Sequence, residues 1–273
     1  MSVSLPSHWT LRVFTTEIRR ILAYRVDFWL QFVFSLFAHV AGAWFLWRAV
    51  FDAQGVETLQ GYSLHALMLY YVMVPLITRM VFGPGLGTIA QEIYDGSLNR
   101  YLVYPTGFFT YKYVQFLANA LVFMLQLIFA CALFVLFTGI PDDITLSARS
   151  LLMGTTAVAV AGLLAFTLSS AIEMIAFWAD NVWSLLVMVR FCVGLLGGAM
   201  IPLAFFPSTV RPLLNVLPFS SLTSFPITCF LGNVSLQHWA AGLLRGAGWS
   251  GACTLLCLLV WRRGRYRYTG VGI

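Results

Sequence analysis

The stretch KYVQFLANALVFMLQLIFACALFVLFT, residues 112–138, is apolar almost from end to end, and Lys112 is its only charged residue. A helix rises about 1.5 Å per residue, so roughly twenty residues cross the ~30 Å hydrocarbon core of a bilayer. A strand of a transmembrane barrel would instead alternate apolar and polar residues over about ten positions. The stretch therefore predicts a membrane-spanning helix.

The whole chain has the composition of a membrane protein. Of its 273 residues, 60% are hydrophobic and 10% are charged, and the mean hydropathy is +0.85. Soluble domains carry about 25% charged residues. Similar apolar runs recur, and we predict six spans at about 27–50, 64–83, 112–138, 150–177, 183–206 and 240–261. The predicted fold class is an all-α polytopic membrane protein, in which residues 1–273 form a single transmembrane domain.

Arginines gather just outside the first and last predicted spans. The two groups are Arg12, Arg19, Arg20 and Arg25, and Arg262, Arg263, Arg265 and Arg267. Basic flanks stay on the cytoplasmic side, so both termini are predicted to be cytoplasmic, which requires an even number of spans. The connections 52–61 and 141–149, which are richer in acids, then lie outside. The net charge of +6 reflects this orientation, and no nucleic-acid partner is expected.

The N-terminal residues 7–25 predict a helix that lies in the membrane interface. Leu11, Phe14, Ile18 and Ile21 recur at helical spacing, and most of the arginines occupy other faces. An amphipathic helix of this kind buries its apolar side in lipid and turns its cations toward the headgroups. The alternative is a simple helical extension of the first span.

Two connections have unusual compositions. QEIYDGSLNRYLVYP, residues 91–105, gathers acids and an arginine between two apolar runs, on the side predicted to be cytoplasmic. From the residues alone it could be an ordinary solvated loop that ends at a proline. The outer connection 207–239 is too apolar for a solvated loop and is interrupted by four prolines. We predict that it re-enters the outer leaflet as a hairpin buried against protein.

The sequence offers little for catalysis. Lys112 is the only lysine and stands in TYKY, so the chain has no GxxxxGK[ST] phosphate-binding loop. The four histidines are scattered without metal-ligand spacing, and no GxSxG motif occurs. We therefore expect no enzyme, no metal site and no cofactor bound by this chain. Any ATP hydrolysis must come from another polypeptide.

Charges within predicted spans are costly and so informative. Glu173 and Arg190 lie at similar depth on either side of a turn that contains Asp180, which predicts an inner-side ion pair between them. The alternative is that each side chain reaches the inner interface by itself. No acid clearly lies at the bilayer midplane, where a proton-coupled secondary transporter would need one.

Three stretches resemble the permease subunits of ABC type-2 exporters, in a branch of ABC-2-like permeases. The first is EIYDGSLNRYLVYPTGFFTYKY, residues 92–113, which is similar to the family's segment between spans two and three. The second is FWADNVWSL, 177–185, and the third is GAMIPLAFFPSTVRPLLNVLPFSSLTSFPITCFLGN, 198–233. The second departs from the family pattern, since Asn181 follows Asp180 where a small residue is expected.

The resemblance implies a coupling helix in residues 91–105 that inserts into a groove of a separate cytoplasmic ATPase. The implied coupling residues are Gln91, Glu92, Ile93, Asp95, Gly96, Leu98, Arg100, Leu102 and Pro105. The charged residues would pair across the contact, and the apolar residues would pack against the ATPase. The outer segment, with Pro202, Phe206, Pro207, Pro218 and Pro226, would cap the exit of the translocation path.

The resemblance also implies the partners. Two copies of the ATPase would bind ATP and magnesium, and a second permease, identical or related, would complete the translocation path in a bacterial cell (inner) membrane, among membrane lipids. Two rivals stay open: a secondary transporter that needs no ATPase, and a membrane-embedded scaffold subunit.

Overall fold

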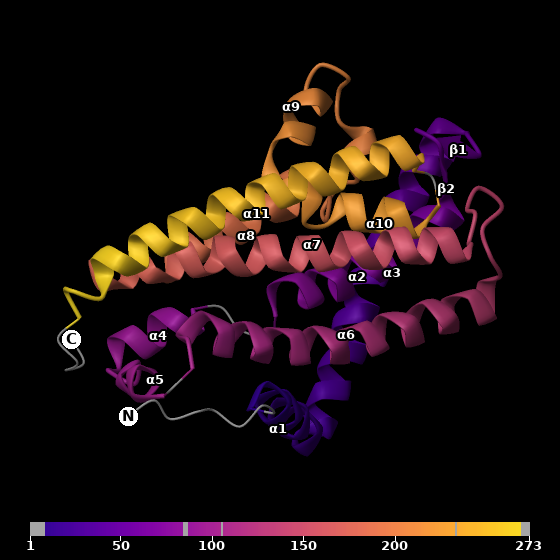
Figure 1. The fold of residues 1–273 in the computed structure, drawn as a ribbon. Coiled ribbons are helices and arrows are strands. Elements are labelled where there is room, and N and C mark those ends of the chain that lie inside the picture. The colour runs from indigo at the N-terminus through magenta and orange to yellow at the C-terminus, as the bar shows by residue number, and fades with distance from the viewer. Residues whose placement is uncertain (1–8, 84–86, 105, 233, 269–273) are drawn as a thin grey trace.

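The computed structural model describes residues 9–83, 87–104, 106–232 and 234–268. Five long helices make up most of it: α2 (Arg25–Gln54), α3 (Leu64–Phe82), α6 (Phe108–Thr138), α7 (Ala148–Glu173) and α11 (Leu236–Gly264). The end of α11 lies near α4 at one end of the molecule, and a small hairpin of β1 (Thr58–Leu59) and β2 (Tyr62–Ser63) lies at the other (Figure 1). The fold is helical, as predicted.

Five of the six predicted spans are confirmed as helices long and apolar enough to cross a membrane. In the described part of the chain these are Val26–Gln54, Leu64–Phe82, Phe108–Thr138, Ala148–Phe177 and Leu236–Gly264. The last turn of the fourth is the short 3-10 helix η1 (Met174–Phe177). Their outward faces carry large apolar side chains such as Phe37 and Phe137, which are 72% and 78% exposed. An apolar surface of this extent fits contact with lipid.

The remaining predicted span, 183–206, is not confirmed, because it does not form one continuous helix. Helix α8 (Trp183–Leu196) stops after 14 residues and is therefore about 21 Å long. The chain then turns at Gly198, whose φ of +87° suits glycine. The turn is fixed by side chains from α3: the hydroxyl of Tyr70 donates to the carbonyl of Gly198 at 2.7 Å, and that of Tyr71 donates to the carbonyl of Met200 at 2.8 Å.

Helix α3 forms the centre of the bundle. It contacts α2, α6 and α7, and side chains such as Leu67, Tyr70 and Ile77 are completely buried. Helices α7 and α11 run side by side along one face of the molecule (Figure 1). The core therefore forms around one apolar helix that has little contact with the surroundings.

The chain between residues 203 and 230, which includes most of the outer connection, folds into short helices. These are η2 (Leu203–Phe205), α9 (Arg211–Val216), η3 (Pro218–Ser221) and α10 (Ser224–Phe230). Helix α10 packs on α7 and α3, and α9 projects from the bundle (Figure 1). Pro202, Pro218 and Pro226 are buried, Phe206 is half-buried and Pro207 is exposed.

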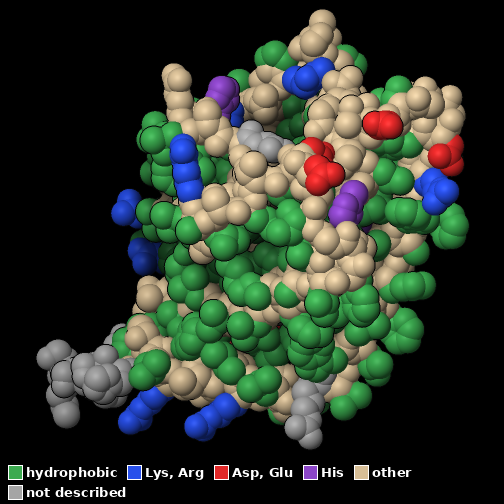
Figure 2. Space-filling model, turned by 90° about the vertical axis from the view of Figure 1, so that its right-hand side faces the viewer, with side chains coloured by type: hydrophobic (Ala, Val, Ile, Leu, Met, Phe, Trp, Pro, Cys, Tyr) green, Lys and Arg blue, Asp and Glu red, His purple; other side chains and the backbone are tan. Residues whose placement is uncertain are grey.

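A single aspartate joins the β-hairpin to the connection between α6 and α7. Asp143 accepts hydrogen bonds from the backbone N–H and the hydroxyl of Ser63, both at 2.8 Å. On the face that Figure 2 shows, hydrophobic side chains cover a wide area and the acidic side chains are confined to its upper part. Acids are thus kept away from the apolar belt.

Candidate functional site

The polar residues after α3 form two short helices, α4 (Thr88–Tyr94) and α5 (Asn99–Val103), which we call the α4–α5 segment. A tight turn joins them. Gly96 has a φ of +75°, and the carboxylate of Asp95 accepts the backbone N–H of Ser97 at 2.9 Å. Hydrogen bonds from the side chain and backbone of Ser97 hold the pKa of Asp95 below its ordinary value. The turn between α4 and α5 is therefore held by specific hydrogen bonds.

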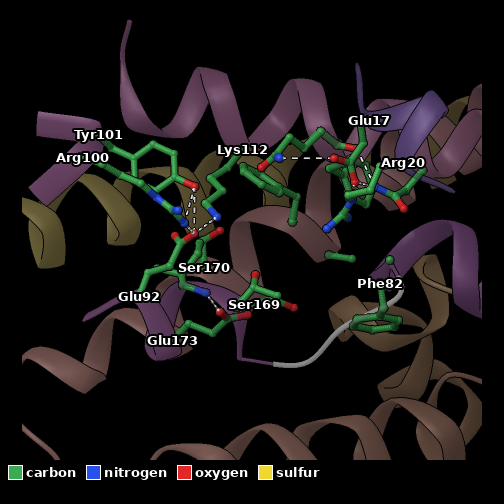
Figure 3. A pocket seen from close by; sticks show the side chains of 18 residues that line it. Glu17, Arg20, Phe82, Glu92, Arg100, Tyr101, Lys112, Ser169, Ser170 and Glu173 are labelled. Carbon is green, nitrogen blue, oxygen red and sulfur yellow. Dashed lines mark hydrogen bonds and ion pairs between the residues drawn. The ribbon is translucent and has the colours of Figure 1, made fainter. Parts of the chain in front are cut away.

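Glu92 on α4 is the centre of a buried hydrogen-bond cluster. Its Oε1 accepts from Lys112 Nζ at 2.7 Å, from the hydroxyl of Tyr101 at 2.8 Å and from Arg100 Nη2 at 3.1 Å (Figure 3). Burial, and then the bond to Glu92, raise the pKa of Tyr101, which stays protonated and donates. The only lysine of the chain, at the start of α6, thus ties that span to α4.

Glu173, near the end of α7, binds the other side of the α4–α5 segment. Its Oε2 accepts the backbone N–H groups of Ile89 at 2.6 Å and Ala90 at 3.3 Å (Figure 3). These groups have no partner within the first turn of a helix. The carboxylate therefore satisfies donors that are otherwise buried without an acceptor.

The structure does not contain the predicted Glu173–Arg190 ion pair. The two residues are both described and form no salt bridge, since the guanidinium of Arg190 lies over the ring of Phe82, 5.5 Å from its centroid. Asp180 is exposed in the turn before α8, and the neighbouring Asn181 accepts the backbone N–H of Trp183 at 2.8 Å. Asn181 therefore organises the start of α8.

A third buried carboxylate, Glu17, comes from the N-terminal helix α1 (Trp9–Ala23). It is bonded by Arg20 and accepts from Asn119 Nδ2 at 3.0 Å and from Gln115 Nε2 at 3.4 Å. The sequence analysis missed this role. Glu17 lies three residues after Phe14 and four before Ile21, within the apolar stripe of the helix, and an acid in that position was the available signal.

The three glutamates line one cavity of about 290 Å³ between α1, α4, α6 and α7 (Figure 3). Lys112, Arg100, Ser169 and Ser170 line it as well. In the described part of the chain no group of three or more His, Cys, Asp or Glu residues is arranged to hold a metal ion. The polar contacts around this cavity join the α4–α5 segment to α6 and α7, and join α1 to α6.

Two tyrosines attach the same segment to later parts of the chain. The hydroxyl of Tyr94 donates to the carbonyl of Ala179 at 3.0 Å, and that of Tyr268 donates to the carbonyl of Gly96 at 2.8 Å. A displacement of the segment would therefore act on the turn before α8 and on the residues that follow α11.

The segment has an inner and an outer face, and this changes the roles implied by the sequence. Ile93 and Leu98 are 2% and 1% exposed and pack inside the chain with Met174, Phe177 and Val182. They are not available to a partner in this conformation, and Glu92 is occupied internally. The exposed residues are Gln91, Asp95, Asn99, Arg100 and Tyr104. Pro105 and the side chain of Leu102 lie outside the described part of the structure.

Comparison with known proteins gives a match to a family. The model of the family described as ABC-2 family transporter protein matches residues 37–272, which include the α4–α5 segment, α8 and the outer helices. No curated protein matches the sequence.

Proposed function

This chain belongs to the ABC-2 family of transporter proteins, and on that premise we propose that it is the permease subunit of an ATP-driven exporter. The chain would bind no nucleotide itself. Two copies of a separate cytoplasmic ATPase would bind ATP and magnesium, and a second permease, identical or related, would complete the translocation path in the cell (inner) membrane.

The observation that carries this proposal is the attachment of the α4–α5 segment to the rest of the chain. Glu92 bonds Lys112 on α6, and Glu173 on α7 bonds the first turn of α4. A short helix held in this way has no evident catalytic purpose, but it can pass a displacement to two long helices as a rigid body.

The exposed face of the segment is the proposed docking surface for the ATPase. Gln91, Asp95 and Arg100 lie on it, and Asp95 carries an uncompensated negative charge beyond its hydrogen bonds to Ser97. Charged side chains at the edge of a contact give specificity and register. The buried residues Glu92, Ile93 and Leu98 would transmit the movement without touching the ATPase.

The sixth crossing and the outer gate are part of the same proposal. Helix α8 is too short to cross the membrane alone, so the chain after Gly198 would complete the crossing while buried against α3. The short helices of 203–230 would then dip into the outer leaflet and cap the exit. Both termini would be cytoplasmic, because the arginines flanking α2 and α11 favour that side.

Reconstitution tests the proposal against its rivals. The chain is placed in proteoliposomes with an ABC ATPase that co-purifies with it, and ATP hydrolysis is measured with and without vanadate. We expect vanadate-sensitive hydrolysis that exceeds the activity of either component alone. A secondary transporter would move substrate without the ATPase, and a scaffold subunit would leave the hydrolysis rate unchanged.

A further inference from the structure

A second cavity, of about 540 Å³, lies between α1, α2, α3, α6 and α8 and carries an excess of positive charge. The charged side chains that line it are Arg20, Asp27, Arg79 and Arg190. The first two have partners of their own: Arg20 pairs with Glu17, and Asp27 accepts from Gln31 Nε2 at 2.9 Å. The remaining two arginines therefore determine what the cavity can bind.

Arg79 and Arg190 form no salt bridge with any residue that the structure describes, although the charge of Glu173 acts on Arg190 from a greater distance. Both are half-buried, and the Nε of Arg190 is buried without a hydrogen-bond acceptor. A buried guanidinium donor without an acceptor is costly. Three arginines and one acid line the cavity, and of the three arginines only Arg20 forms a salt bridge, with Glu17.

The depth of the cavity points to a membrane component. Arg79 is in the last turn of α3 and Asp27 in the first turn of α2, so the cavity lies where these spans end. Arg190 lies about 10 Å along α8 from Trp183. Phospholipid phosphates occupy this level of a bilayer, and arginine binds phosphate through two parallel hydrogen bonds.

Part of the remaining wall is apolar. Phe28 of α2 and Phe123 of α6 line the cavity, and their ring centroids are 5.9 Å apart. A cationic end beside aromatic walls fits a molecule with an anionic head and a hydrocarbon tail. We propose that this cavity binds the phosphate head of an anionic membrane amphiphile, whose negative charge would pair with Arg79 and Arg190 and supply an acceptor for the buried Nε of Arg190.

Lipid binding to the full chain in detergent tests this site. The affinities for phosphatidylglycerol, zwitterionic phosphatidylcholine and inorganic phosphate are measured by native mass spectrometry and by thermal stabilisation. We expect phosphatidylglycerol to bind at least tenfold more tightly than phosphatidylcholine, and the double variant Arg79→Gln/Arg190→Gln to lose that preference. The control variant Arg48→Gln removes an exposed arginine that pairs with Asp52, outside the cavity, and should keep it.

Equal binding of the two lipids by the wild-type chain would overturn the proposal, as would a preference that survives in the double variant. Stabilisation by inorganic phosphate as strong as that by phosphatidylglycerol would show a site for a free anion and refute the amphiphile. If the double variant does not fold, the single variants Arg79→Lys and Arg190→Lys replace it. Each should weaken phosphatidylglycerol binding severalfold, because lysine keeps the charge but loses the paired hydrogen bonds. The measurement needs no ATPase, so its outcome is independent of the docking proposal.

Discussion

Lys112 Nζ lies 2.7 Å from Glu92 Oε1, and both side chains are nearly buried, at 10% and 11% exposure. The contact joins the first helix of the α4–α5 segment to the start of a 31-residue span. Removing one member of a buried ion pair leaves the other charge without a counterion, which is usually worse than removing both. The pair therefore makes the position of α4 depend on that of α6.

Replacing Glu92 tests this link. Glu92→Ala leaves Lys112 buried and unpaired, and we expect a loss of about 3–5 kcal/mol of stability. The double variant Glu92→Gln/Lys112→Met should be less damaging than Glu92→Ala. Thermal unfolding followed by tryptophan fluorescence in detergent measures both, with Asp142→Asn at the opposite end of the molecule as the control. An unchanged melting temperature in Glu92→Ala would show that the Glu92–Lys112 ion pair does not stabilise the fold.

Replacing Glu173 shows whether its partner is the backbone of α4 or the side chain of Arg190. Glu173→Ala removes the acceptor for the first turn of α4 and should cost about 1–3 kcal/mol, whereas Glu173→Gln keeps a carbonyl oxygen and should cost less. Arg190 forms no salt bridge with Glu173 and senses only its more distant charge, so the coupling energy in a Glu173→Gln/Arg190→Gln cycle should lie near the lower end of the range of about 0.5–3 kcal/mol found for contacting pairs. A larger coupling would restore the ion pair that the sequence predicted.

Glu17→Ala should loosen α1 from α6. The change removes the acceptor of Asn119 Nδ2 and leaves buried amides unsatisfied, at a cost of about 1–3 kcal/mol. Limited proteolysis should then cleave within α1 faster than in the wild-type chain. Thr16→Ala, on the exposed side of the same helix, is the matched control, and equal cleavage rates in the two variants would refute the role of Glu17.

Gly198→Ala should destabilise the turn that ends α8. An alanine there would adopt a φ of +87°, and its Cβ would lie 2.8 Å from the Cβ of Ser224 and 3.1 Å from the hydroxyl of Tyr70. Strain of this kind costs about 1–3 kcal/mol. Gly248→Ala, in α11 with open space around the new methyl group, should be neutral or slightly stabilising. Similar melting temperatures for the two variants would mean that the turn tolerates a side chain.

The long helices could be predicted from the sequence because hydrophobic length is a local property. The end of α8 could not, since it depends on Tyr70 and Tyr71, far away in the sequence. The partner of Glu173 was missed for a related reason. The groups that donate hydrogen bonds to Glu173 are backbone N–H groups at the start of α4, and no side-chain pattern reveals where that helix begins.

The polar composition of residues 91–105 indicated a functional segment but not its orientation. The family resemblance implied that Ile93 and Leu98 pack against the ATPase, yet the chain uses them to dock α4 and the following turn on η1. Tertiary contacts decide which face of so short a helix is buried. The exposed residues, which include Gln91, Asp95 and Tyr104, could therefore be identified only from the structure.

Charge reversal at Asp95 tests the central claim most directly, because this side chain is exposed and belongs to no ion pair in the described structure. The measurement is co-purification with the ATPase, together with the stimulated hydrolysis rate, for Asp95→Lys and for Asp142→Lys at the opposite end. We predict that Asp95→Lys loses the ATPase, with at least a tenfold fall in stimulated activity, while Asp142→Lys behaves as the wild type. Because Asp95→Lys also removes the acceptor of the Ser97 N–H, its melting temperature should fall slightly, whereas Asp95→Asn keeps an acceptor oxygen and separates this effect from the loss of charge. An Asp95→Lys chain that still binds the ATPase and is still stimulated would contradict the assignment of the α4–α5 segment as the coupling site.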